Sequence, residues 1–193
     1  MKTLSKKIYI LPGWGHLLSD EGYKKLLEIT SVRGYTLQPL DFNTRNPERS
    51  LGGDELFSDL IKRLSTQIPD PCDEDIILGF SIGALIAYKL SGKRRFSQAI
   101  ICSMSPCLGN DLRILPREET VDFSEAQYQE MVQMEYGKSI STKITFLYGS
   151  KETTDLKERS IDLGKQNHST SIEISNADHE LDDIYVEKIK EVL

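Results

Sequence analysis

The sequence contains no long hydrophobic run, although it has 193 residues and is 38% hydrophobic. Its apolar runs fall well short of the roughly 18 residues that a membrane-spanning helix needs. The apolar stretch after the charged N-terminus, residues 8–11, is also too short for the core of a signal peptide. We therefore expect a cytoplasmic protein with no membrane partner.

Basic residues are in the minority, with 24 Lys and Arg against 30 Asp and Glu, which gives a net charge of −6. The densest basic cluster, residues 93–95, follows an expected helix end and is typical of a solvated cap. A nucleic-acid-binding protein usually carries a basic patch or stripe. This charge pattern disfavours a nucleic-acid partner.

Cysteine is scarce: the chain has three, Cys72, Cys102 and Cys107. An odd number without regular spacing argues against a disulfide scaffold. Cys102 lies in an apolar run and is expected to pack as a small hydrophobic residue. Cys102 and Cys107 have no His or Cys pair beside them to complete a metal site. We therefore expect neither a metal nor another cofactor.

Short apolar runs alternate with helical patterns along the chain. Strands are expected at residues 8–11, 35–42, 76–78, 99–104, 144–149 and 171–175, and helices at 20–32, 54–67, 84–91, 155–166 and 184–193. Strands that are apolar throughout and alternate with helices predict a parallel sheet covered on both faces. The sequence thus predicts one α/β domain, a three-layer sandwich with a mostly parallel sheet of about six strands.

Residues 105–142 are the least regular part of the chain, with a helix expected only at 125–136. This segment lacks the long apolar pattern of a full lid domain. We expect it to form a small cap beside a fairly open site.

The most informative stretch is Gly79-Phe80-Ser81-Ile82-Gly83, between an apolar run at 76–78 and a small-residue helix start at 84–87. Strand, G-x-S-x-G and helix together define a nucleophile elbow, in which a strained turn exposes a serine. Gly79 and Gly83 would leave room for the strand and the helix to pack closely.

Other chemically active side chains also follow predicted strands. Residues 13–16 follow the first strand, Glu152 and Asp155 follow the fifth, and His179 follows the sixth. Functional groups gather beyond the carboxyl ends of parallel strands, so these residues and Ser81 should meet at one edge. A serine needs a base, usually a histidine held by an acid, and the chain order serine, acid, histidine is the one expected with this elbow.

Four motifs make the chain resemble the α/β-hydrolase-fold proteins over nearly its whole length, in a compact version without the first two strands of that fold. They are residues 11–15, 79–83, 148–152 and 177–179. The resemblance implies that Ser81 is the nucleophile and His179 the general base. It also implies that the backbone N–H groups of Trp14 and Ile82 form the oxyanion hole.

The expected triad has two candidates for its acid, because the family usually has Asp after this strand. Here Glu152 is the third residue past Gly149, and Asp155 lies three further on. Position favours Glu152 over Asp155. His179 also lies among several acidic residues, whose charges are expected to raise its basicity.

The resemblance implies a serine hydrolase that cleaves a carboxylic ester and needs no cofactor. The alternative substrates are a thioester or an ester carried on an acyl-carrier protein, and a non-catalytic hydrolase-like binding protein is a different class that stays open. A dinucleotide fold is disfavoured: Gly13 and Gly15 follow the first strand and Asp41 the second, but the third glycine position holds Leu18.

Overall fold

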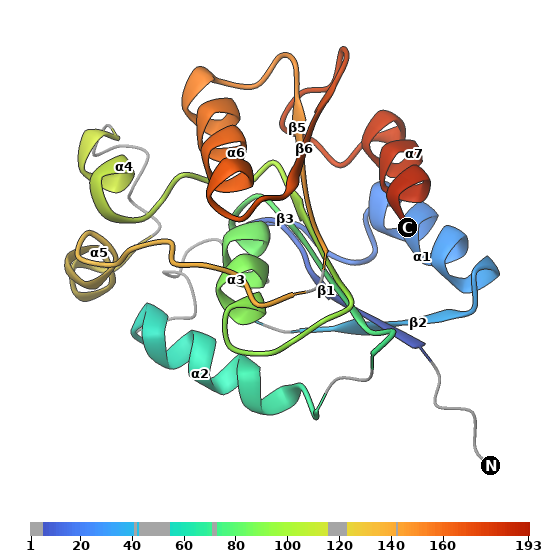
Figure 1. The fold of residues 1–193 in the computed structure, drawn as a ribbon, viewed down its shortest axis with the longest axis horizontal. Helices are drawn as coiled ribbons and strands as arrows, with labels where there is room; N and C mark the ends of the chain where they lie inside the picture. Colours follow the sequence, from blue (N-terminus) through green and yellow to red (C-terminus); the bar gives the residue numbers. More distant parts are fainter. Residues whose placement is uncertain (1–5, 41, 43–54, 71–72, 116–122, 142) are drawn as a thin grey trace.

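A six-stranded, wholly parallel sheet forms the centre of the molecule, in the order β2-β1-β3-β4-β5-β6 (Figure 1). The computed structural model describes residues 6–40, 42, 55–70, 73–115, 123–141 and 143–193. The strands are β1 (Lys6–Leu11), β2 (Tyr35–Pro39), β3 (Ile76–Phe80), β4 (Gln98–Cys102), β5 (Ile144–Gly149) and β6 (Thr170–Ile174). The predicted parallel sheet is confirmed.

Helices cover both faces of this sheet. Figure 1 shows α1 (Glu21–Val32) and α7 (Asp183–Val192) on one face, and α2 (Phe57–Gln67), α3 (Ile82–Ser91) and α6 (Thr154–Gln166) on the other. Two short helices, α4 (Gly109–Ile114) and α5 (Glu125–Met131), lie outside this second layer. The predicted three-layer α/β architecture is therefore confirmed. No helix in the described ranges is long and apolar enough to cross a bilayer.

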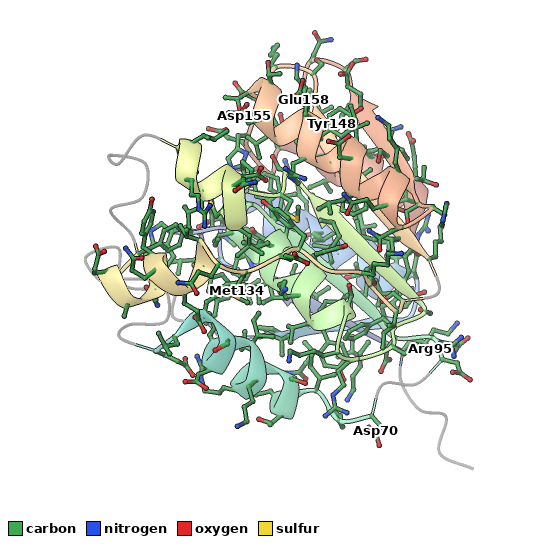
Figure 2. All side chains as sticks on the ribbon, turned by 60° about the vertical axis from the view of Figure 1, so that its left-hand side comes forward. Asp70, Arg95, Met134, Tyr148, Asp155 and Glu158 are labelled. Carbon is green, nitrogen blue, oxygen red and sulfur yellow. The ribbon has the colours of Figure 1, made fainter. Side chains whose placement is uncertain are left out.

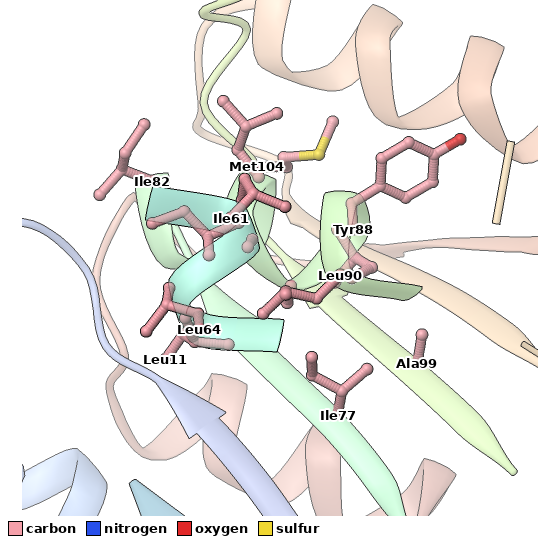
Figure 3. Packing of buried hydrophobic residues seen from close by; sticks show 14 of the residues in the cluster. Leu11, Ile61, Leu64, Ile77, Ile82, Tyr88, Leu90, Ala99 and Met104 are labelled. Atoms are coloured by element: carbon pink, nitrogen blue, oxygen red, sulfur yellow. The ribbon is translucent and has the colours of Figure 1, made fainter. Parts of the chain in front are cut away.

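The strands are apolar throughout because each face of the sheet is buried under its own helices. In β1, Ile8 and Ile10 contribute to the core under α1 and α7, whereas Tyr9 and Leu11 contribute to the core under α2 and α3. Figure 3 shows the second of these cores, where Leu11 and other strand residues pack against the helices. The alternating side chains of a strand thus fill two separate cores.

Several elements differ from the predictions at their ends. The strand predicted at 35–42 stops at Pro39, on the edge of the sheet, where a proline can be tolerated because its missing N–H faces no partner strand. The strand predicted at 99–104 ends at Cys102, because Ser103 adopts a positive φ of 53°. The helix predicted at 125–136 ends at Met131.

Helix α4 was not predicted, since its six residues carry no clear periodicity. Non-local contacts hold it: Arg159 Nε on α6 donates to Asp111 Oδ2 at 2.5 Å, and Tyr136 Oη donates to the same atom at 2.7 Å. Of the segment predicted as a small cap, residues 116–122 and 142 lie outside the described residues, as do Asp41 and Cys72. That 105–142 forms a cap on a single domain stays a prediction.

The connection from β3 into α3 depends on two glycines that let backbones approach closely. A methyl group on Gly79 would overlap the carbonyl oxygen of Gly83, and one on Gly83 would overlap the carbonyl oxygens of Leu11 and Pro12. The obstructing atoms are backbone, so they cannot move aside as a flexible side chain could. The Gly79 contact packs the start of α3 against β3, as the glycine spacing predicts, and the Gly83 contact also packs it against the end of β1.

Replacing Gly83 by alanine is expected to lower the free energy of unfolding by about 3 kcal/mol, because the added methyl overpacks rigid backbone. In a chain of this size such a loss lowers Tm by about 9 °C. Gly34→Ala is the control: its methyl would meet no atom within 4 Å, and its φ of +80° alone costs about 1 kcal/mol. Equal Tm values for the two variants in thermal unfolding would contradict this account.

Candidate active site

Ser81 occupies a strained turn between β3 and α3. Its φ of 56° and ψ of −125° lie in a region that residues other than glycine rarely adopt. The Ser81 N–H donates to the carbonyl oxygen of Cys102 at 3.0 Å, which fixes the turn against the end of β4. This backbone strain at the N-terminus of a helix is the signature of a nucleophile elbow.

The imidazole of His179 lies at hydrogen-bond distance from the hydroxyl of Ser81. Its Nε2 atom lies 2.9 Å from Ser81 Oγ, although the residues are 98 positions apart. The Phe80 ring packs against the imidazole with 5.5 Å between ring centroids. A serine hydroxyl at hydrogen-bond distance from a histidine is the arrangement that allows proton transfer between them.

The loops after β5 and β6 are tied together by backbone hydrogen bonds. Ser150 N–H donates to the Ile174 carbonyl at 2.9 Å, and Lys151 N–H donates to the Ala177 carbonyl at 3.0 Å. These bonds fix the position of Glu152 in the first loop relative to His179 in the second.

Glu152 is 5% exposed, and its two carboxylate oxygens have different surroundings. Oε1 accepts hydrogen bonds from Ser103 Oγ and, at 2.5 Å, from Tyr185 Oη. Oε2 has no hydrogen-bond partner within the described part of the chain. Ser103 Oγ also lies 2.8 Å from His179 Nδ1, so this hydroxyl stands between the acid and the histidine.

Asp155, the alternative acid, lies elsewhere. It is exposed in the first turn of α6, and Figure 2 shows it near Glu158 on that helix. The structure therefore brings Ser81, His179 and Glu152 together and leaves Asp155 outside the cluster.

Both predicted oxyanion donors lie close to Ser81, Ile82 in the sequence and Trp14 in space. Ile82 directly follows it, and Trp14 directly follows Gly13, where an added methyl would lie 3.3 Å from Ser81 Cβ. Among the described residues, neither the Trp14 N–H nor the Ile82 N–H has a hydrogen-bond partner. Because Ile82 begins α3, the positive end of that helix dipole also favours negative charge here.

Sequence reasoning missed three hydroxyl groups of the cluster: Ser103, Tyr185 and Ser105, whose Oγ lies 3.2 Å from Ser81 Oγ. Ser105 directly follows the strand predicted at 99–104, so the strand-end rule that selected the other candidates could have found it. Ser103 lies inside that predicted strand, where the rule does not apply. Tyr185 lies in α7 among core residues, where its spacing signals only burial.

Burial lowers the pKa of His179 below its ordinary value of 6.5, and it outweighs the opposing charges of Glu152 and Asp178. A charge on nearby His16 lowers this pKa further. Asp178, one of the acids beside His179 in the sequence, thus acts in the expected direction, but burial makes the net shift of this pKa a downward one. Two of those acids have other partners: Asp182 caps α7, and Asp183 pairs with Lys25 at 2.6 Å.

The geometry gives no support to a metal or dinucleotide site. The described residues contain no cluster of three or more His, Cys, Asp or Glu side chains that could hold a metal ion. Cys102 is buried, and burial raises the pKa of its thiol. The Gly13 N–H, which a phosphate would need, donates instead to Tyr23 Oη at 2.9 Å, and α1 begins only at Glu21.

Comparison with solved structures shows which class of fold this is. Est1E from Butyrivibrio proteoclasticus, with ferulic acid bound, aligns over 97% of this chain and 86% of its own, with a TM-score of 0.75 and 12% identity. Mouse alpha/beta hydrolase domain-containing protein 10 aligns over 100% and 89%, with a TM-score of 0.73 and 13% identity. The chain has the α/β-hydrolase fold, as the sequence motifs predict.

A third structure, the alpha/beta hydrolase MGS-MChE2 from a lagoon-sediment metagenome of Mar Chica, Morocco, aligns over 99% of this chain and 90% of its own. Its TM-score is 0.67 and its identity 14%. No family model and no curated protein matches the sequence. The likeness is therefore one of fold, and the site must carry the argument about function.

The pKa of His179 should fall further in Glu152→Gln, because the carboxylate charge is what opposes the effect of burial. It should rise in His16→Gln, which removes a like charge. Titration of the imidazole resonances by NMR measures both shifts, and His179→Gln assigns the signal. Shifts of the same sign in the two variants would contradict these electrostatics.

Proposed function

We propose that this protein is a serine hydrolase that cleaves a carboxylic ester through an acyl-enzyme intermediate. The observation that carries the proposal is the 2.9 Å contact between Ser81 Oγ and His179 Nε2, with Ser81 in a positive-φ turn. A hydroxyl in such a turn, next to a base and at a helix N-terminus, suits attack on a carbonyl carbon.

The reaction follows from the positions of these groups. His179 Nε2 takes the proton of Ser81 Oγ as that oxygen bonds to the ester carbonyl carbon. The N–H groups of Trp14 and Ile82 stabilise the resulting oxyanion, a donor of this kind being worth on the order of 3 kcal/mol. His179 then gives the proton to the departing alcohol oxygen, which leaves Ser81 acylated.

Water completes the cycle on the same residues. His179 removes a proton from the water as its oxygen attacks the acyl carbon, and the proton returns to Ser81 when the acid leaves. The lowered pKa of His179 supports this role, because it keeps the imidazole neutral, and so able to accept a proton, at neutral pH.

Esters and thioesters present the same carbonyl group to this site. Candidate substrates to be tested therefore include both esters and thioesters, each as a free small molecule and as an acyl group on a carrier protein. A p-nitrophenyl ester series of increasing acyl length, run beside matching acyl thioesters, measures the preference as kcat/KM. A protein that binds such ligands without turnover would belong to the non-catalytic class instead.

A fluorophosphonate probe should label the wild-type protein and fail to label Ser81→Ala, because the probe reacts only with an activated serine. Intact-mass measurement detects the adduct, and its loss in Ser81→Ala assigns it to Ser81. Ser105→Ala is the matched control, since Ser105 Oγ is the neighbouring hydroxyl at 3.2 Å, and this variant should still be labelled. Labelling of Ser81→Ala at the wild-type rate would rule out the assigned nucleophile.

Glu152→Gln should lower kcat on short p-nitrophenyl esters about 10²- to 10⁴-fold, because the imidazolium formed during attack loses its anionic support. Asp155→Asn should hydrolyse the same esters at close to the wild-type rate, since Asp155 is exposed on α6. The reverse order of the two rates would assign the acid to Asp155.

A further inference from the structure

The carboxylate of Glu152 is joined to His179 by way of the hydroxyl of Ser103. Ser103 Oγ hydrogen-bonds to Glu152 Oε1 and lies 2.8 Å from His179 Nδ1. Within the described ranges, no direct hydrogen bond or ion pair joins Glu152 to His179. We propose that Ser103 is a positioning residue that couples Glu152 to His179, so that these three side chains and that of Ser81 act as one unit. The inference rests on the proposed serine-hydrolase function.

The direction of the hydrogen bonds follows from the chemistry of each group. An ionised carboxylate only accepts, whereas a hydroxyl has one proton to donate and lone pairs to accept with. Ser103 Oγ therefore donates its proton in a hydrogen bond to Glu152 Oε1 and accepts a hydrogen bond from the Nδ1–H of His179. This arrangement leaves Nε2 without a proton and facing Ser81 Oγ, which is the tautomer that a general base needs.

The backbone at Ser103 is strained in a way that serves this contact. Its φ is 53°, whereas an extended backbone at this position would continue the hydrogen-bond ladder of β4. Its N–H still donates to the Leu147 carbonyl at 2.7 Å, and the residue is fully buried. Strain of this kind persists only where the surroundings hold it, and it concentrates at functional sites.

Tyr185 fixes the other end of the connection. Its hydroxyl donates to the same oxygen, Glu152 Oε1, that accepts from Ser103. Its ring packs edge-on against Phe80 with 5.4 Å between centroids, so α7 holds the phenol in place. These two donors fix the orientation of the Glu152 carboxylate. Its Oε1 atom therefore faces Ser103, which in turn contacts His179.

The first test measures hydrolysis in Ser103→Ala and Ser103→Gly. Both should lower kcat about 10- to 100-fold, with KM unchanged because Ser103 contacts His179 rather than substrate. Glycine accepts positive φ freely and alanine does not, so equal losses in the two variants assign the effect to the hydroxyl. Wild-type kcat in both variants would overturn the proposal.

A double-mutant cycle separates coupling from a merely structural role. If Glu152 acts through Ser103, then Ser103→Ala combined with Glu152→Gln should be within about threefold of the slower single variant. Losses that multiply in the double variant would show two independent contributions and overturn the proposal. Ser160→Ala, which removes a buried hydroxyl that has no hydrogen-bond partner in the described residues, should keep the wild-type rate.

The second test needs no activity. Ser103→Ala should lower the pKa of His179 in an NMR titration, because the Nδ1–H of the imidazolium loses its acceptor, while the charged groups that face it, Glu152, Asp178 and His16, stay in place. An unchanged pKa would overturn the coupling. If the wild type neither hydrolyses esters nor takes up the fluorophosphonate, the proposed function fails, and this titration still decides the role of Ser103.

Discussion

The close contact between the start of α3 and the end of β1 is the constraint on which the site depends. Because Gly83 lies directly against the carbonyl groups of Leu11 and Pro12, the chain leaving β3 must turn within a single residue. That residue, Ser81, takes a positive φ, and α3 begins immediately after it. The same contact brings the loop that carries Trp14 beside Ser81, so one packing requirement places both the proposed nucleophile and the predicted oxyanion donors.

A second pattern extends along this edge of the sheet. Both β3 and β4 are followed directly by a serine with positive φ, and each of these serines donates its backbone N–H to a carbonyl of the next strand. The two turns set Ser81 Oγ and Ser103 Oγ on opposite nitrogens of the same imidazole. The parallel sheet thus supports the histidine from two successive strands, and α7 adds Tyr185 behind the acid.

The sequence predicted most of the fold because a buried parallel strand is apolar on both faces; β5 was predicted with both its ends. Ser81, Glu152 and His179 could be selected because each lies shortly after a predicted strand, where a parallel sheet collects its functional groups. Ser103 was hidden inside the strand predicted at 99–104, since its positive φ is maintained by hydrogen bonds to residues far away in the sequence. Helix α4 was missed for a similar reason. It is stabilised by hydrogen bonds from Arg159 and Tyr136, which are distant in the sequence, and not by its own helix propensity.

The unpartnered Oε2 of Glu152 has a consequence for how this chain can change under selection. A buried acceptor without a donor in the described part of the chain costs about 1–3 kcal/mol of folding stability. Selection for thermal resistance alone should therefore remove Glu152 only together with the buried hydroxyls of Ser103 and Tyr185, which would otherwise lose the acceptor that they share. A lineage kept under demand for turnover should retain it. Thermostable descendants that have lost Glu152 would mark the point at which folding and chemistry make opposite demands on one side chain.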